Sequence, residues 1–190
     1  MRTLLFLSGS SLRTSLNSRL SIAAARFAES KFGGQINVLS VDLMEYALPP
    51  IAASAADDPS VGALTKLFNG ADGFFVSADE YTGAFSTQFR LSLNWLMLAE
   101  TETRPVLSGK PTALVGAAPM GVGGMRGLPA LKHLLEVAAM DVHLQQLRPD
   151  TRGGPVDKNG NLTAASSKLL MDGALGRVTE LLKETSESTA

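Results

Sequence analysis

Three short segments of this chain combine residues that could bind a charged or aromatic ligand. The first, residues 9–17, reads GSSLRTSLN and follows a short apolar run. Backbone N–H groups at a helix start, hydroxyl side chains and Arg13 can surround a phosphate with hydrogen-bond donors, and the helix dipole favours its negative charge. A polar turn that ends in a helix cap at Ser15 or Asn17 explains the same residues. From this segment alone, a phosphate site and a capped turn are equally good interpretations.

The second segment, 79–85, reads DEYTGAF, and the third, 116–124, reads GAAPMGVGG. A planar heteroaromatic ligand could stack near Tyr81 while backbone groups bond to its polar edge. In isolation, an ordinary Asp/Gly turn with Tyr81 partly buried is the favoured explanation. The glycines of the third segment allow a ligand to approach the backbone closely, but they also suit a flexible turn.

The elements around these segments alternate between strand and helix. Short apolar runs bounded by glycine or proline are typical of parallel strands buried on both faces. Such runs cover 3–8, 71–79 and 112–117, and the more polar segments 35–43 and 141–147 are strand-like. Apolar residues at helical spacing follow each run, around 20–28, 59–68, 85–97, 128–138 and 170–181. This alternation predicts one α/β domain over 1–190, a three-layer sandwich with a five-stranded parallel sheet of order 2-1-3-4-5 and a frayed C-terminal tail, ETSESTA.

The predicted topology brings the three segments together. In an open parallel sheet, ligands bind beyond the carboxyl ends of the strands, near the point where the strand order reverses. The three segments follow the first, third and fourth predicted strands, so their carboxyl ends share one edge. We therefore expect a single site at that edge.

Composition and charge exclude several classes of function. The net charge of −1 comes from 17 basic and 18 acidic residues without a block of either sign, which gives no footprint for nucleic acid. The chain has no cysteine, and His133 and His143 are too few and too separated for a metal cluster, so we expect no metal and assign both histidines structural roles. The opening MRTLLFLSGS reads as a strand rather than a signal peptide, and no run is long enough to span a membrane. We expect a cytoplasmic protein with no membrane partner.

Three common motifs are incomplete. A nucleotide-hydrolysing P-loop needs Ser or Thr after Gly-Lys, but Pro111 follows Lys110. A dinucleotide fingerprint starting at Gly121 would need glycine where Arg126 stands. No G-x-S-x-G elbow supports a serine hydrolase.

Taken together, the segments resemble the NADPH-dependent FMN reductase family, which includes bacterial quinone, chromate and azo reductases. The resemblance spans most of the chain and rests on GSSLRTSLN, on ADGFFVSADEYTGAFSTQFRLSLNWL at 71–96 and on GKPTALVGAAPMGVGGMRG at 109–127. It implies a flavodoxin-like fold, FMN as cofactor, NADPH or NADH as transient electron donor, and a quinone or related small molecule as acceptor.

The resemblance also assigns cofactor-binding positions. Those matching the phosphate loop are Ser10, Arg13, Ser15, Leu16 and Asn17. Those matching the isoalloxazine loop are Glu80, Tyr81, Thr82 and Gly83. Those beside the ring and the ribityl chain are Gly116, Ala117, Met120, Gly121 and Gly124. The family's arginine lies one position nearer the first glycine, and common forms of its second motif have proline and asparagine in place of Asp79 and Thr82. No catalytic side chain is expected, because the flavin N5 carries the hydride.

Two other functions fit the same loops. The fold could hold FMN as an electron-transfer module without nicotinamide-dependent turnover, or it could be a flavin-free interaction protein. The resemblance further implies a homodimer or homotetramer, formed through the helices that follow the third and fourth strands. Phe85, Phe89, Trp95 and the apolar face 128–135 could form that contact, or they could belong to the chain's own core.

Overall fold

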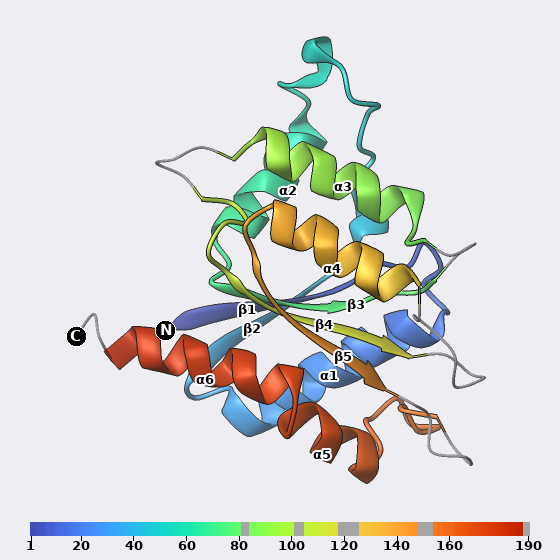
Figure 1. Ribbon diagram of the computed structural model, residues 1–190, viewed down its shortest axis with the longest axis vertical. Helices are drawn as coiled ribbons and strands as arrows, with labels where there is room; N and C mark the ends of the chain where they lie inside the picture. Colours follow the sequence, from blue (N-terminus) through green and yellow to red (C-terminus); the bar gives the residue numbers. More distant parts are fainter. Residues whose placement is uncertain (81–83, 101–104, 118–125, 148–153, 188–190) are drawn as a thin grey trace.

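The computed structural model describes residues 1–80, 84–100, 105–117, 126–147 and 154–187. They form one parallel sheet with helices packed against it (Figure 1). Its strands are β1 (Arg2–Ser8), β2 (Ile36–Val41), β3 (Gly73–Ser77), β4 (Pro111–Ala117) and β5 (Asp141–Leu147). Their order is β2-β1-β3-β4-β5, and every neighbouring pair is parallel. The predicted order is therefore confirmed, and the reversal point lies where β1 has β2 on one side and β3 on the other.

Helices cover both faces of the sheet. They are α1 (Leu16–Phe32), α2 (Pro59–Asn69), α3 (Thr87–Leu98), α4 (Gly127–Val137), α5 (Ala164–Met171) and α6 (Ala174–Glu187), with short 3-10 turns η1 (Leu43–Glu45) and η2 (Ala53–Ala55). Figure 1 shows α1, α5 and α6 below the sheet and α2, α3 and α4 above it. This three-layer arrangement is the predicted flavodoxin-like fold.

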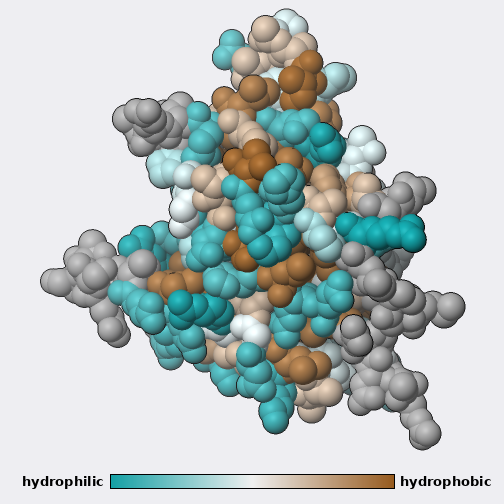
Figure 2. Space-filling model, viewed as in Figure 1, coloured by the Kyte–Doolittle hydropathy of each residue, from teal (hydrophilic) through white to brown (hydrophobic). Residues whose placement is uncertain are grey.

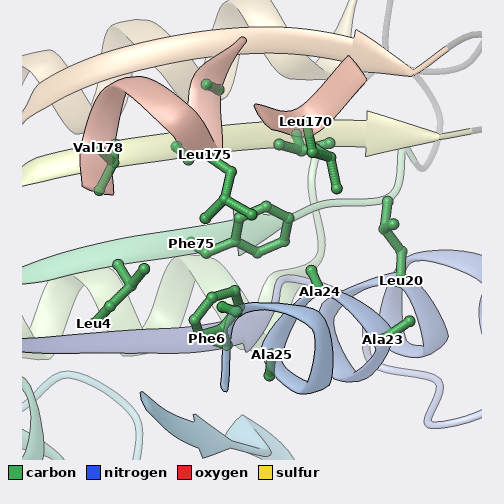
Figure 3. Packing of buried hydrophobic residues seen from close by; sticks show 14 of the residues in the cluster. Leu4, Phe6, Leu20, Ala23, Ala24, Ala25, Phe75, Leu170, Leu175 and Val178 are labelled. Carbon is green, nitrogen blue, oxygen red and sulfur yellow. The ribbon is translucent and has the colours of Figure 1, made fainter. Parts of the chain in front are cut away.

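Alternation along the strands builds two cores. Leu4 and Phe6 of β1 pack with residues of α1 and α6, whereas Leu5 and Leu7 pack with residues of α2, α3 and α4. Figure 3 shows Phe6 beside Phe75 of β3, and the centroids of these rings are 5.0 Å apart. Burial on both faces explains why the three inner strands, β1, β3 and β4, read as nearly continuous apolar runs, whereas the edge strands β2 and β5 are more exposed and contain more polar residues.

The first helix begins four residues before the apolar pattern that starts at Leu20. Ser15 is its N-cap, and the hydroxyl accepts a hydrogen bond of 3.0 Å from the N–H of Ser18. Apart from Leu16 its first turn is polar, so the periodicity of apolar residues could not reveal it, although the cap residue was among those predicted.

The C-terminal part forms two helices where the sequence predicts one. The side chain of Gln145 on β5 lies at the break: Nε2 donates to the carbonyl of Leu169 at 2.7 Å, and Oε1 accepts from the N–H of Ala174 at 2.9 Å. A Cβ on Gly173 would lie 2.5 Å from this amide, so a side chain there would displace it. Gln145 thus satisfies backbone groups at the end of α5 and the start of α6, and α6 then extends into the tail as far as Glu187.

Figure 2 shows polar side chains over much of the face that α4 occupies, with apolar side chains gathered near the connection that precedes α2. In the described residues no helix is both long enough and apolar enough to cross a bilayer. Within the same residues, no three His, Cys, Asp or Glu side chains are grouped as metal ligands would be. His133 lies in α4, and Nε2 of His143 on β5 lies 3.2 Å from Asp141.

Candidate flavin site

The carboxyl ends of β1, β3 and β4 meet at one edge, as the topology predicts. The N–H of Gly9, just after β1, donates to the carbonyl of Ser77 at 2.8 Å. The N–H of Ala78, just after β3, donates to the carbonyl of Val115 at 3.0 Å. The hydroxyl of Ser86, which caps α3, donates to the carbonyl of Gly9 at 2.6 Å. The segments that begin at residues 9, 78 and 116 are therefore hydrogen-bonded neighbours.

The loop after β1 is shaped by its own serine hydroxyls. Ser10 Oγ accepts from the N–H of Leu12 at 3.1 Å, and Ser18 Oγ donates to the carbonyl of Leu12 at 2.8 Å. Ser18 Oγ is also 3.1 Å from Ser15 Oγ and from Ser8 Oγ. These bonds hold the loop in a defined shape around the start of α1.

Two backbone donors at that helix start have no acceptor in the described part of the chain. They are the N–H groups of Leu16 and Asn17, and Asn17 is 1% exposed. The first N–H groups of a helix have no partner within the helix, and with the helix dipole they attract an anion. The structure therefore fits a phosphate at this loop, where the resemblance puts the FMN phosphate.

Asn17 of α1 joins the ends of β3 and β4. Its Nδ2 donates to the carbonyl of Ala117 at 2.9 Å and to the carboxylate of Asp79, while its Oδ1 accepts from the N–H of Ala117 and from Ser77 Oγ, both at 2.9 Å. Two donors and two acceptor sites are the full capacity of an amide side chain. A phosphate contact through this side chain would require one of these bonds to break, whereas the backbone N–H of the same residue is open.

Arg13 lies on the opposite side of its loop from β3. Its Nε is 2.5 Å from the carboxylate of Asp42, at the end of β2, and its side chain is 65% exposed. Leu12 occupies the position at which the family has its arginine, and it is exposed. The one-residue shift of the arginine thus accompanies an ion pair with Asp42 that the sequence did not indicate.

Glu80 caps a helix from another loop. Its Oε2 accepts from the N–H groups of Arg126 and Gly127, at 3.1 and 3.0 Å, at the start of α4. Arg126, the N-cap residue, provides no side-chain cap of its own. A Cβ on Gly127 would lie 3.1 Å from Cγ of Glu80, which explains the glycine. The segment after β3 is therefore attached to α4; the absence of a Ser, Thr, Asp or Asn cap before α4 was the signal that could have indicated it.

Gly116 and Ala117 end β4 and are buried. A side chain on Gly116 would collide with Leu128 of α4, so packing of the helix against the strand accounts for this glycine. Six expected site residues lie outside the described residues: Tyr81, Thr82, Gly83, Met120, Gly121 and Gly124.

The fold is that of a flavodoxin-like protein, and two backbone N–H groups at the start of α1 have no acceptor among the described residues. The family model for NADPH-dependent FMN reductase matches residues 1–148, and the chain belongs to this family. It is thus an oxidoreductase of that family, whose cofactor is FMN. A comparison with curated protein sequences gives no significant match.

Solved structures share the fold. The flavoenzyme FerB, an NAD(P)H:(acceptor) oxidoreductase from Paracoccus denitrificans, is 18% identical, with 97% of this chain and 98% of that chain covered and a TM-score of 0.70. RosB with a bound 8-demethyl-8-formylriboflavin-5'-phosphate is 15% identical, with 100% and 82% covered and a TM-score of 0.70. An FMN-dependent NADH-azoreductase from Bacillus anthracis with FMN is 11% identical, with 97% and 99% covered and a TM-score of 0.58.

Proposed function

We propose that this chain is an NAD(P)H-dependent FMN oxidoreductase that passes electrons to quinones or related small acceptors. The observation that carries the proposal is the pair of open backbone donors, on Leu16 and Asn17, inside a serine-shaped loop at the family's phosphate position. Family membership supplies the class of reaction, and these donors support the proposed position of the cofactor phosphate.

In this proposal, some of the described residues bind the FMN phosphate, and others hold the loops around the cofactor in position. Ser10, Ser15 and the N–H groups of residues 16 and 17 hold the phosphate. The amide of Asn17 and the carboxylate of Glu80 keep the surrounding segments in place through bonds to Ala117 and to the start of α4.

The remaining positions assigned by the resemblance are proposed contacts of the ring and the ribityl chain. They are Tyr81, Thr82, Gly83, Met120, Gly121 and Gly124, with the backbone of Gly116 and Ala117 beneath them. When bound, FMN accepts hydride from NAD(P)H at N5 and returns two electrons to the acceptor, so the protein needs no nucleophile of its own.

We further propose that donor and acceptor use one opening in turn, because the chain has a single set of ring-side loops and no separate nicotinamide fingerprint. Initial rates measured while both substrates are varied should then give parallel double-reciprocal lines, with excess acceptor competing against NAD(P)H. Intersecting lines together with a captured complex of both substrates would show two simultaneous sites.

The visible spectrum of the purified or FMN-reconstituted protein tests the proposal directly. Anaerobic NADPH or NADH should bleach the flavin absorbance rapidly, and a quinone should restore it. Bound flavin that neither nucleotide bleaches would instead support an electron-transfer module. A protein that stays colourless after reconstitution would support a flavin-free interaction protein.

We propose a homodimer, or a tetramer built from it, formed through α3 and α4. Phe89, Trp95 and the residues 128, 131 and 135 belong to the chain's own core, so they are not free for this contact. Leu98 and Val137, at the ends of α3 and α4, are 63% and 60% exposed and are better candidates. Sedimentation equilibrium of the wild type and of Leu98→Glu would test the contact. The cytoplasm remains our proposed compartment.

A further inference from the structure

A cavity of about 320 Å³ lies on the β2 side of the loop after β1, away from β3 and β4. Its lining comes from the end of β1, the phosphate loop, the first turns of α1, the end of β2 and η1. The cavity lies at the carboxyl edge of the sheet and shares Arg13 with the phosphate loop, and Ser18 of its lining donates to the carbonyl of Leu12 in that loop. Its volume is near the lower limit of about 300 Å³ for small-molecule pockets, which suits part of a dinucleotide rather than a whole one.

The lining contains a polar group that the described chain leaves unbonded. The hydroxyl of Ser21 is buried without a partner, and the residue is only 3% exposed. A buried hydroxyl that lacks a partner costs folding free energy, so native proteins rarely retain one. Ser40 and Glu45, which also line the cavity, are exposed, so their hydroxyl and carboxylate can bond to water or to a ligand.

This set of groups suits a ribose. A carboxylate accepts hydrogen bonds from two neighbouring sugar hydroxyls, serine hydroxyls bond to the remaining oxygens, and the apolar side chains of Ile22 and Val41 can pack against the sugar. An acidic side chain near the end of the second strand has this role in dinucleotide-binding sheets. Here Glu45 follows β2 by four residues.

The charged side chains of the cavity bear on which nicotinamide donor it could accept. Among the described residues of the lining, Arg13 is the one cation, and Asp42 already neutralises it at 2.5 Å. Glu45, an exposed residue of the lining, has no ion-pair partner among the described residues. A 2'-hydroxyl can donate to this carboxylate, whereas a 2'-phosphate would be repelled by it.

We propose that this cavity binds the adenosine ribose of the electron donor and that Glu45 makes NADH the preferred donor over NADPH. The inference rests on the proposed function, because it assigns a second part of the same donor to a site beside the phosphate loop. The nicotinamide end would then reach the ring-side loops on the other side of β1.

The test compares Glu45→Gln with Glu29→Gln, an equal change of charge on an exposed α1 residue that does not line the cavity. Three donors are used: NADH, NADPH and reduced nicotinamide mononucleotide, which lacks the adenosine. For Glu45→Gln, KM for NADH should rise roughly tenfold, as expected for a lost charge-assisted bond, and KM for NADPH should fall. The KM for the mononucleotide and kcat should stay unchanged, and Glu29→Gln should match the wild type.

A binding measurement provides a readout besides turnover. Calorimetric titration with AMP should show binding to the wild type and roughly tenfold weaker binding to Glu45→Gln. Ser21→Ala should also weaken AMP binding, yet its melting temperature without ligand should be higher, because the unbonded hydroxyl is gone.

Two outcomes overturn the inference: an unchanged ratio of kcat/KM for NADH and NADPH in Glu45→Gln, or AMP affinity that neither variant alters. Failure of every nicotinamide donor to reduce the bound flavin would instead overturn the proposed function. AMP binding that depends on Glu45 would still support the ribose site in that case.

Discussion

Removing the carboxylate of Glu80 should loosen α4 and weaken flavin binding together. In Glu80→Ala, the N–H groups of Arg126 and Gly127 lose their acceptor at 3.1 and 3.0 Å, and no side chain of the N-cap residue replaces it. Hydrogen bonds to a charged group contribute about 1.5–3 kcal/mol, so we expect a loss of roughly 2 kcal/mol. For a chain of this size, that corresponds to a fall in Tm of about 4–8 °C.

Glu80→Gln separates the contribution of the hydrogen bonds to the Glu80 side chain from that of its negative charge. Glutamine keeps an acceptor oxygen but removes the charge at the helix N-terminus, which by itself contributes about 0.3–1 kcal/mol. Glu136→Gln is the matched control, because it makes the same substitution at the other end of α4, where Glu136 pairs with Lys132 on the surface. We expect the control to change stability by less than about 0.5 kcal/mol.

Urea unfolding of the FMN-free protein measures the stability, and quenching of flavin fluorescence measures the dissociation constant for FMN. Glu80→Ala should shift both, Glu80→Gln should shift both less, and Glu136→Gln should shift neither. Wild-type values for Glu80→Ala in both assays would refute the claim that this carboxylate joins the segment after β3 to α4.

Three further predictions follow from other contacts. Ser15→Ala should lower stability by about 1 kcal/mol through the lost cap and should reduce affinity for FMN more than for riboflavin; equal losses would contradict the phosphate assignment. Gln145→Ala should destabilise the chain by roughly 1–3 kcal/mol, because backbone groups between α5 and α6 lose their partner; an unchanged urea midpoint would show that water replaces it. Gly83→Val should reduce flavin occupancy more than Thr82→Ser in folded protein, since a branched side chain obstructs a close approach to the backbone; equal occupancy would remove the role proposed for this segment.

The sequence predicted the inner strands β1, β3 and β4 because parallel strands buried on both faces must be apolar at nearly every position. The start of α1 was less visible, since the helix begins at Leu16 and its first turn is mostly polar. The break between α5 and α6 was not visible at all. It depends on Gln145, a residue of β5 that precedes Ala174 by 29 positions, and helical periodicity contains no information about such a partner.

The convergence of the loops was predictable, but the bonds that organise them were not. Topology alone brought the segments after β1, β3 and β4 to one edge. The partners of Asn17 are 60 to 100 residues away, and those of Glu80 are 46 and 47 residues away. Motif resemblance marked both residues as important, yet it could not distinguish a side chain that touches a ligand from one that fixes the segments around it. Their contacts with FMN remain predictions.

The full hydrogen bonding of the Asn17 side chain has a consequence for how a ligand would enter and leave. The last residues of a strand normally open and close rapidly, but Ala117, the last residue of β4, is held through both its N–H and its carbonyl. In hydrogen exchange, the amide of Ala117 should therefore exchange as slowly as amides in the middle of the sheet. The edge of the sheet then acts as a rigid floor, and any movement that admits or releases a bound molecule must take place in the segments above it.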